Sequence, residues 1–320
     1  MTSASTAAVS AYRAWWMSSR PTSPRENKNG IQKDPLRAAD ILHGVRAVRL
    51  RGGEASAPAA PEQTETLPTE TPEPTPEPTP VPTPTVEERA RELIRGGEYQ
   101  AAIELLDGAD GDEAELLRLK AEISAAAVGE HVLFGSYEQD DVTDNGAEPL
   151  EWIVLSRDGD KAQLMTGYLI DTQPYHDVFD GTSTWAECTL RAWLNEDFYT
   201  AAFTENEQKL VLETELENKD NPAYGTPGGS NTVDRVYLLS IDEARALSRE
   251  QLLAPVTSYT AHRGGTVNAM GNGWWWLRSP GVYSRDAAYV DALGKISEYG
   301  YIIHRSAWDI RPVIWVDLSV

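Results

Sequence analysis

Aromatic and small polar residues alternate between positions 283 and 309, near the C-terminal end of this 320-residue chain. Tyrosine and tryptophan rings supply rigid amphipathic contact area, while serine, arginine and aspartate side chains supply adaptable hydrogen bonds. We predict that these residues lie largely exposed and bind a ligand. The alternative is an aromatic-rich β core with solvated loops. The residues concerned are Tyr283, Ser284, Arg285, Asp286, Tyr289, Asp291, Tyr299, Tyr301, His304, Ser306, Trp308 and Asp309.

Binding through a metal ion is not predicted. Calcium-dependent sugar binding needs a cluster of acidic and amide ligands, and the chain has no Glu-Pro-Asn, Gln-Pro-Asp or Trp-Asn-Asp triplet. The acidic loop at 140–146 has the composition of a calcium-binding loop. Counted from Asp141, however, the position that should carry a bidentate glutamate falls on Trp152. We predict a turn there, and neither a metal site nor a cofactor.

The side chains that usually carry out catalysis do not form a recognisable set. The only thiol, Cys188, falls mid-helix among apolar neighbours, where a buried and inert cysteine is typical. The five histidines have no HExxH or HxH spacing, and no Gly-x-Ser-x-Gly elbow or phosphate-binding glycine loop occurs. Carboxylates are too abundant for one pair to stand out. We therefore predict no catalytic residue and a chain that binds instead of catalysing.

The formal net charge of −22 is unevenly distributed. Residues 1–53 carry nine Lys and Arg against three Asp and Glu, about +6, so the remainder carries 19 against 47, about −28. An acidic body repels phosphates, which disfavours a nucleic-acid partner. The chain has no run of eighteen apolar residues, and its N-terminus lacks the apolar core of a signal peptide. We predict no transmembrane segment and leave the location open.

Composition divides the chain into four parts. Residues 1–55 form a basic segment that we expect to be disordered. Residues 56–85 contain ten of the twenty prolines and read as an extended spacer. Residues 86–127 carry apolar residues at helical spacing, and 97–106 looks like one tetratricopeptide-style unit. Because such repeats need about three copies for stability, this single unit should dock on another part of the protein.

Residues 128–320 combine strand and helix patterns and predict an α+β domain. We expect strands at 131–135, 151–155, 161–165 and 235–239, and helices after Thr184, Thr204 and Ser240, each of which begins a capping box. The three tryptophans at 274–276 are mostly core residues. Arg278 and Arg311 should be structural, each paired with a buried carboxylate such as that of Glu151 or Asp317.

Several spaced blocks together resemble a bacterial family of uncharacterised domains that is similar to C-type-lectin-like folds. The blocks are Val132-Leu133-Phe134-Gly135 with Tyr137-Glu138-Gln139-Asp140, Glu151-Trp152-Ile153-Val154-Leu155, Thr184-Trp185, Leu190-Arg191 with Trp193-Leu194-Asn195, Phe198-Tyr199, Ala202-Phe203, Trp275 through Gly281, and Arg311-Pro312. The resemblance covers roughly 128–320. It implies a C-type-lectin-like domain with a mixed or antiparallel sheet and two to three helices. That scaffold is also used by formylglycine-generating enzymes and by the variable proteins of diversity-generating retroelements.

The sequence as a whole predicts a non-catalytic, lectin-like module that presents 283–309 to a protein or glycan ligand. The resemblance adds that the surface could be diversified. One alternative is a structural or protein-interaction module, in which the helices and the proline spacer make the partner contacts. A second is an enzyme related to the formylglycine-generating scaffold. It is disfavoured because those enzymes rely on a pair of cysteines and this chain has one.

Overall fold

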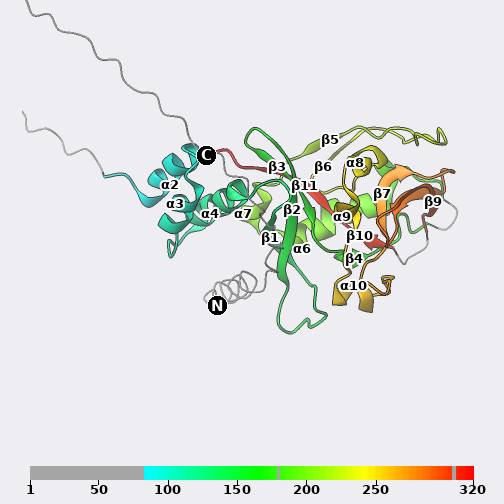
Figure 1. Cartoon of the computed structure of the whole chain (residues 1–320), viewed down its shortest axis with the longest axis horizontal. Helices are drawn as coiled ribbons and strands as arrows, with labels where there is room; N and C mark the ends of the chain where they lie inside the picture. The colour runs from blue at the N-terminus through cyan, green and yellow to red at the C-terminus, as the bar shows by residue number, and fades with distance from the viewer. Residues whose placement is uncertain (1–82, 179–180, 305–307) are drawn as a thin grey trace, which may run out of the picture. The chain divides into compact units, whose positions relative to one another are not determined.

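The computed structural model describes residues 83–178, 181–304 and 308–320, all within one unit, Pro82–Val320. Figure 1 traces these residues from cyan to red. The predicted basic segment at 1–55, nearly all of the proline spacer at 56–85 and the predicted site residue Ser306 lie outside the described residues.

Three helices, α2 (Val86–Arg95), α3 (Tyr99–Leu105) and α4 (Asp112–Ala125), occupy the segment predicted to be helical. Thr85 starts α2 with a capping box completed by Glu88. Gly97 has a φ of +77°, a left-handed conformation that turns the chain between α2 and α3 with no steric cost to glycine. The three helices share a small core of their own that includes Ile94 and Leu106.

The helical unit docks on the rest of the protein, as its single copy led us to expect. Leu119 and Ile123 of helix α4 pack in the main hydrophobic core. The Arg157 guanidinium donates hydrogen bonds of 2.5 Å to the carbonyls of Ile123 and Ala126, at the end of the same helix. The helices therefore belong to the packed structure.

Four antiparallel strands form the first sheet, in the order β1-β2-β3-β11. Their bounds are β1 His131–Tyr137, β2 Glu148–Asp158, β3 Lys161–Thr166 and β11 Val313–Asp317. The first three are the strands predicted at 131–135, 151–155 and 161–165. The fourth comes from the C-terminal end of the chain and closes the sheet beside β3.

Five strands form the second sheet, in the order β4-β10-β7-β8-β9. The pair β10–β7 is parallel, and the other pairs are antiparallel. Strand β9 lies at one edge, next to β8, and Figure 1 shows it in brown-orange at the right of the view. The bounds are β4 Asp171–Thr172, β7 Trp275–Pro280, β8 Asp286–Val290, β9 Ile296–Ile302 and β10 Asp309–Ile310. A separate hairpin pairs β5 (Thr214–Leu216) with β6 (Thr232–Asp234).

Short helices connect the sheets, and they are more numerous than the two to three predicted. They are η1 (Trp185–Glu187), α5 (Thr189–Trp193), η2 (Leu194–Phe198), α6 (Tyr199–Ala202), α7 (Glu205–Gln208), α8 (Ile241–Arg245), α9 (Arg249–Leu252) and α10 (Ser258–His262).

Two of the three predicted capping boxes are confirmed, those of Thr204 before α7 and Ser240 before α8. The one at Thr184 is wrong. The chain leaves η1 at Cys188, whose sulfur accepts a hydrogen bond from the Arg191 amide and caps α5 instead. The segment 235–239 is likewise not a strand, because only Tyr237 forms a bridge, to Val313.

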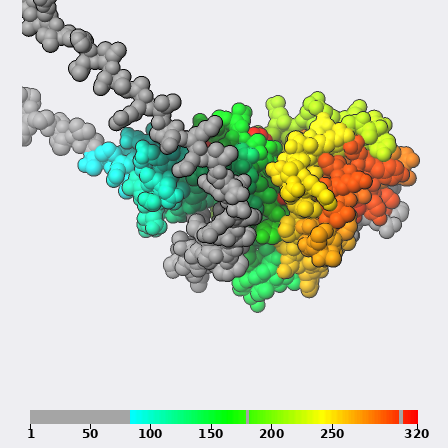
Figure 2. All heavy atoms as spheres, viewed as in Figure 1, coloured from blue at the N-terminus to red at the C-terminus, as the bar shows by residue number. Residues whose placement is uncertain are grey.

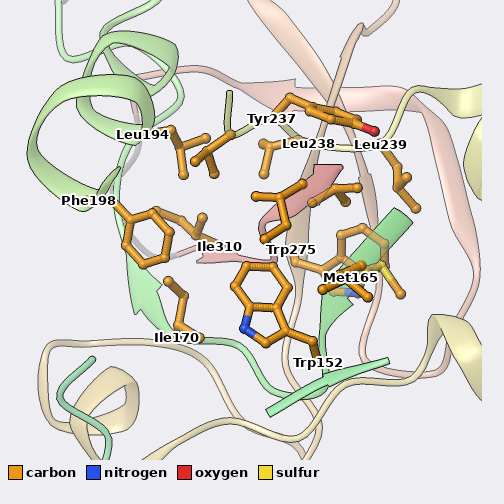
Figure 3. Packing of buried hydrophobic residues seen from close by; sticks show 14 of the residues in the cluster. Trp152, Met165, Ile170, Leu194, Phe198, Tyr237, Leu238, Leu239, Trp275 and Ile310 are labelled. Atoms are coloured by element: carbon orange, nitrogen blue, oxygen red, sulfur yellow. The ribbon is translucent and has the colours of Figure 1, made fainter. Parts of the chain in front are cut away.

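The main core lies between the sheets and the short helices. Figure 3 shows Trp152 and Trp275 surrounded by Phe198, Met165 and Ile170. Trp275 and Trp276 have no exposed surface, which confirms that the tryptophan run is mostly core. The architecture is a mixed α+β fold, as predicted. Among the residues described, no helix has the length and apolar character needed to cross a membrane.

Candidate functional site

Exposed tyrosines gather at the edge formed by β9 and the loop before β8. Tyr299 is 58% exposed, Tyr283 52% and Tyr301 41%, values that are high for aromatic residues. A fourth ring joins them from a distant part of the sequence, because Tyr224 is 49% exposed and lies edge-on to Tyr299 at 6.1 Å. We refer to Tyr224, Tyr283, Tyr299 and Tyr301 as the tyrosine surface.

A stack of rings connects this surface to the core. The Tyr301 ring lies nearly parallel to that of Trp308, at 4.8 Å between centroids. Trp308 in turn stacks on the fully buried Trp276 at 4.7 Å, and Tyr289 meets Trp308 edge-on. Each contact of this kind stabilises the rings by about 0.5–1.5 kcal/mol beyond their buried area. Tyr301 is therefore presented on a rigid support.

The loop that carries Tyr224 is attached to the same edge through Asn221. The Asn221 side chain is buried and donates to the carbonyls of Pro280 and Glu298, at 2.7 and 2.8 Å. Its own oxygen accepts the backbone amides of Ala223 and Tyr224. In Figure 2 the yellow-green loop lies against the orange-red C-terminal strands. Tyr224 could not be predicted from the sequence, because only the long-range hydrogen bonds of Asn221 bring it to the tyrosine surface.

Four of the predicted binding residues are less exposed than expected. Asp286 and Asp309 are buried, so the prediction that they lie exposed is wrong. Tyr289 and Trp308 are half-buried and pack against the main core. Asp286 and Tyr289 belong to β8 and Asp309 to β10, and Trp308 packs within the ring stack.

The remaining predicted residues divide between exposed and half-buried positions. Ser284 and Arg285 are exposed, and the Arg285 guanidinium lies 5.1 Å from the centre of the Tyr283 ring. Asp291 is half-buried and accepts the amides of Leu293 and Lys295, which gives it a role in the turn between β8 and β9. His304 is half-buried.

Two buried aspartates, Asp171 in β4 and Asp309 in β10, lie on neighbouring paired strands. Asp171 accepts hydrogen bonds from the Arg263 guanidinium at 2.8 Å and the Tyr137 hydroxyl at 2.9 Å. The neighbouring Asp309 has no exposed surface, and neither carboxyl oxygen has a hydrogen-bond partner among the described residues. Burial and the charge of Asp171 raise the pKa of Asp309 to about 8, so its carboxyl group is mostly neutral at pH 7.

The Asp309 carboxyl group is also closed off by backbone. One oxygen lies against Gly265 and the other against Gly273, so closely that a Cβ at either glycine would overlap it. A perturbed pKa often indicates a functional site. Here the group is inaccessible to a substrate, and we assign it a structural role.

Both arginines predicted to be structural are buried, but their partners differ from those expected. Arg278 pairs with Glu243 and also donates to the Leu238 carbonyl at 2.9 Å. Arg311 donates to the carbonyls of Thr166 and Gln251 and lies 5.2 Å from the Trp275 ring centre. Burial lowers the pKa of Arg311 to about 9. The carboxylates of Glu151 and Asp317 are not among these partners.

The single cysteine is buried, as predicted, although it caps α5 instead of lying mid-helix. Burial raises the pKa of the Cys188 thiol to about 12. The thiolate, which is the reactive form, is therefore scarce at neutral pH.

Three carboxylates near the β1–β2 loop, those of Glu138, Asp140 and Glu148, lie close enough together to hold an ion. Backbone amides already occupy them: Glu138 accepts from Asp141 and Val142, and Glu148 from Gln139. Residues 140–146 form a loop with a turn, in agreement with the prediction. Through these hydrogen bonds the acidic side chains stabilise the loop between β1 and β2.

The fold and the surface together define an α+β protein with exposed tyrosines at one sheet edge. The chain belongs to the family described as Domain of unknown function (DUF6273), whose sequence model matches residues 159–318. Neither a curated protein nor a solved structure matches the chain. The match starts within the β2–β3 turn and includes every residue of the tyrosine surface.

Proposed function

We propose that this protein is a non-catalytic binding module that captures a protein ligand on the tyrosine surface without a metal ion. The observation that carries the proposal is the cluster of four exposed tyrosines, one of them stacked through Trp308 on the buried Trp276. Tyrosines held on a rigid scaffold give large contact area at small entropic cost, which is why they dominate protein-binding surfaces.

Two further features favour a protein over a glycan. Arg285 lies beside the Tyr283 ring, and tyrosine and arginine are, with tryptophan, the residue types enriched in protein-binding hot spots. The largest flat ring near the surface, that of Trp308, is half-buried between Tyr301 and Trp276. It therefore does not offer the open indole face that a sugar ring would stack on.

We further propose that the scaffold is C-type-lectin-like and that its displayed residues are diversified. The mixed α+β fold and the position of Tyr283, Tyr299 and Tyr301 in the C-terminal part of the chain support this proposal. Its genetic test is inexpensive. A near-repeat of the 3′ coding region beside a reverse-transcriptase gene, differing at adenines, supports diversification. A single copy of the coding region, with no near-repeat and no reverse-transcriptase gene beside it, contradicts diversification.

The direct test probes an array of purified bacterial surface proteins and a glycan array with the full chain, and then measures the affinity of each hit. Replacing Tyr283, Tyr299 and Tyr224 with alanine should weaken a protein hit by about tenfold for each tyrosine at the centre of the contact. The melting temperature should hardly change because these rings are exposed. Tyr168→Ala, at a partly exposed tyrosine outside this surface, is the matched control.

Three outcomes contradict the proposal. Binding to glycans alone would replace the protein ligand with a sugar. Equal losses in the control and the triple variant would show that the surface is not the binding site. Loss of a hit after Glu104→Lys and Glu115→Lys, at exposed positions of α3 and α4, would favour the alternative module that binds through its helices.

A further inference from the structure

The same dipeptide, asparagine followed by glycine, occurs in two contrasting places of the described structure. The pairs are Asn145-Gly146 and Asn272-Gly273, and a third, Asn29-Gly30, lies outside the described residues. The side chain of an asparagine can react with the backbone nitrogen of the next residue, and glycine hinders this approach least because it has no Cβ. In a folded protein the reaction also requires that the backbone around the pair can move.

The first pair lies in the open. Residues 142–147 are all exposed, in the loop that Figure 1 shows projecting from the ends of β1 and β2. A Cβ placed on Gly146 would meet no atom of the described residues within 4 Å. The backbone N–H of Gly146 donates to no backbone carbonyl of the described residues. The nitrogen that would attack is therefore free, and the loop has room to move.

Two exposed hydrogen bonds restrain Asn145 itself. Its backbone amide donates to the Val142 carbonyl at 3.1 Å, and its side-chain amide donates to the Asp140 carboxylate at 2.9 Å. The second bond must break before the side chain can turn toward Gly146. Loss of one such bond in water slows the reaction by about five- to thirtyfold and does not prevent it.

The second pair is held in place. The backbone amide of Gly273 donates to the Ala254 carbonyl at 3.1 Å, and that of Asn272 donates to the Asn268 side chain at 3.0 Å. Gly273 is buried, and a Cβ there would overlap a carboxyl oxygen of Asp309. The reaction at Asn272 would therefore require local unfolding that breaks several of these contacts together.

We propose that Asn145 is a site of spontaneous deamidation and that the fold protects Asn272 from the same reaction. The Gly146 nitrogen forms a bond to Cγ of Asn145 and loses its proton. The Cγ–Nδ2 bond breaks, and the side-chain nitrogen leaves as ammonia with that proton. One water molecule then opens the cyclic imide at either carbonyl, which gives aspartate or isoaspartate. Water is the only co-reactant, and the proposal does not depend on the tyrosine surface.

The reaction would change the charge of a loop that is already acidic. Asp140, Asp141 and Asp144 lie in the same loop, and Asp140 accepts the hydrogen bond from the Asn145 side chain. Deamidation replaces that donor with a carboxylate, so an attraction becomes a repulsion between like charges. We expect the modified loop to open more often and to be cut more readily by a protease.

The test is incubation of the full chain in mildly alkaline buffer, followed by peptide mapping by mass spectrometry. In the folded chain, conversion at Asn145 should be at least about tenfold faster than at Asn272, which reacts only after local opening. In concentrated urea the two rates should agree within about threefold, because both pairs are then unfolded. An isoaspartyl methyltransferase should label the peptide that contains residue 145.

Variants show which residue reacts and what the product does. Asn145→Gln should lower the formation of acidic species, measured by isoelectric focusing, by at least about fivefold, because the longer side chain closes a less favourable ring. Asn206→Gln is the matched control, since Asn206 is partly exposed and is followed by Glu207 instead of glycine. Asn145→Asp carries the product's charge, and thermolysin should cut its loop about two- to fivefold faster than that of wild type.

Several results overturn the proposal. Equal conversion at Asn145 and Asn272 in the folded chain would show that the fold does not select between them. No conversion at Asn145, under conditions in which the chain in urea reacts, would show that the loop is too rigid. Acidic species that persist in Asn145→Gln would place the reaction elsewhere. Equal cleavage of Asn145→Asp and wild type would contradict the opening of the loop.

Discussion

Strands β7 and β9 belong to the same sheet, with only β8 between them, yet they place their aromatic residues in opposite environments. Every residue of β7 is buried, and Trp275 and Trp276 have no exposed surface. Strand β9 lies at the edge and exposes Tyr299 and Tyr301. Aromatic content alone therefore does not reveal whether a strand is core or surface. For these two strands the difference lies in their place in the sheet, because β7 is central and β9 is at the edge.

The two strands are nevertheless coupled through Trp308. The indole N–H of Trp276 donates to the Gln173 carbonyl at 3.0 Å, which fixes the buried ring that Trp308 stacks on. Tyr301 continues the stack outward. The buried aromatic residues of β7 thus support the exposed aromatic residues of β9.

The largest effect is expected from Arg311, which is fully buried beside β7. Arg311→Ala leaves the carbonyls of Thr166 and Gln251 unpaired and opens a cavity against Trp275, so it should destabilise the protein by about 3–5 kcal/mol. Arg285→Ala, on the exposed side, should change stability by less than about 0.5 kcal/mol. Urea unfolding of both variants measures the contrast.

Similar midpoints for the two arginine variants would contradict the division into a buried and an exposed region. Arg311→Met adds a check on the cause, because methionine fills most of the volume but cannot donate. It should lie between wild type and Arg311→Ala.

The next effect concerns Asp309, in β10 beside β7. Its pKa of about 8 in the folded protein exceeds its ordinary value of 3.8, so between those pH values the folded chain holds a proton that the unfolded chain has lost. This group therefore stabilises the fold less and less as pH rises from about 4 to about 8, and its contribution is constant above that. Asp309→Asn removes this dependence and should increase stability at pH 8 by about 1–3 kcal/mol.

The measurement is the difference in unfolding free energy between Asp309→Asn and wild type at several pH values. Asp291→Asn is the control, because Asp291 is half-buried and serves the β8–β9 turn. A difference that stays constant from pH 5 to pH 8 would show that Asp309 is ionised in the folded protein.

Much of the fold could be predicted because its signals are local. Strands β1, β2 and β3 follow from apolar runs, and the helices after Thr204 and Ser240 follow from capping boxes whose reciprocal hydrogen bonds span three residues. The failures depend on tertiary contacts. The apolar run at 235–239 reads as a strand, but only Tyr237 pairs, with Val313 near the other end of the chain.

The candidate site was predictable only in part, for the same reason. Tyr283, Tyr299 and Tyr301 could be found because they lie in a segment where aromatic and small polar residues alternate. Tyr224 could not, because its position depends on Asn221 binding carbonyls of residues 280 and 298. The burial of Asp309 could not be predicted from the sequence either. An aspartate that follows a tryptophan in a polar segment is typical of an exposed surface.

The smallest effect is expected from Trp308, at the boundary between the two regions. Trp308→Ala removes a half-buried ring and its stacking on Trp276 and Tyr301, and should destabilise the protein by about 1–2 kcal/mol, well below Arg311→Ala. Trp308→Tyr keeps a ring and should recover about half of that loss. If the tyrosine surface binds its ligand through a rigid Tyr301, Trp308→Ala should also weaken binding, whereas Tyr168→Ala should not. Thermal unfolding and affinity measured on the same samples decide between a ring that only fills space and one that positions its neighbour.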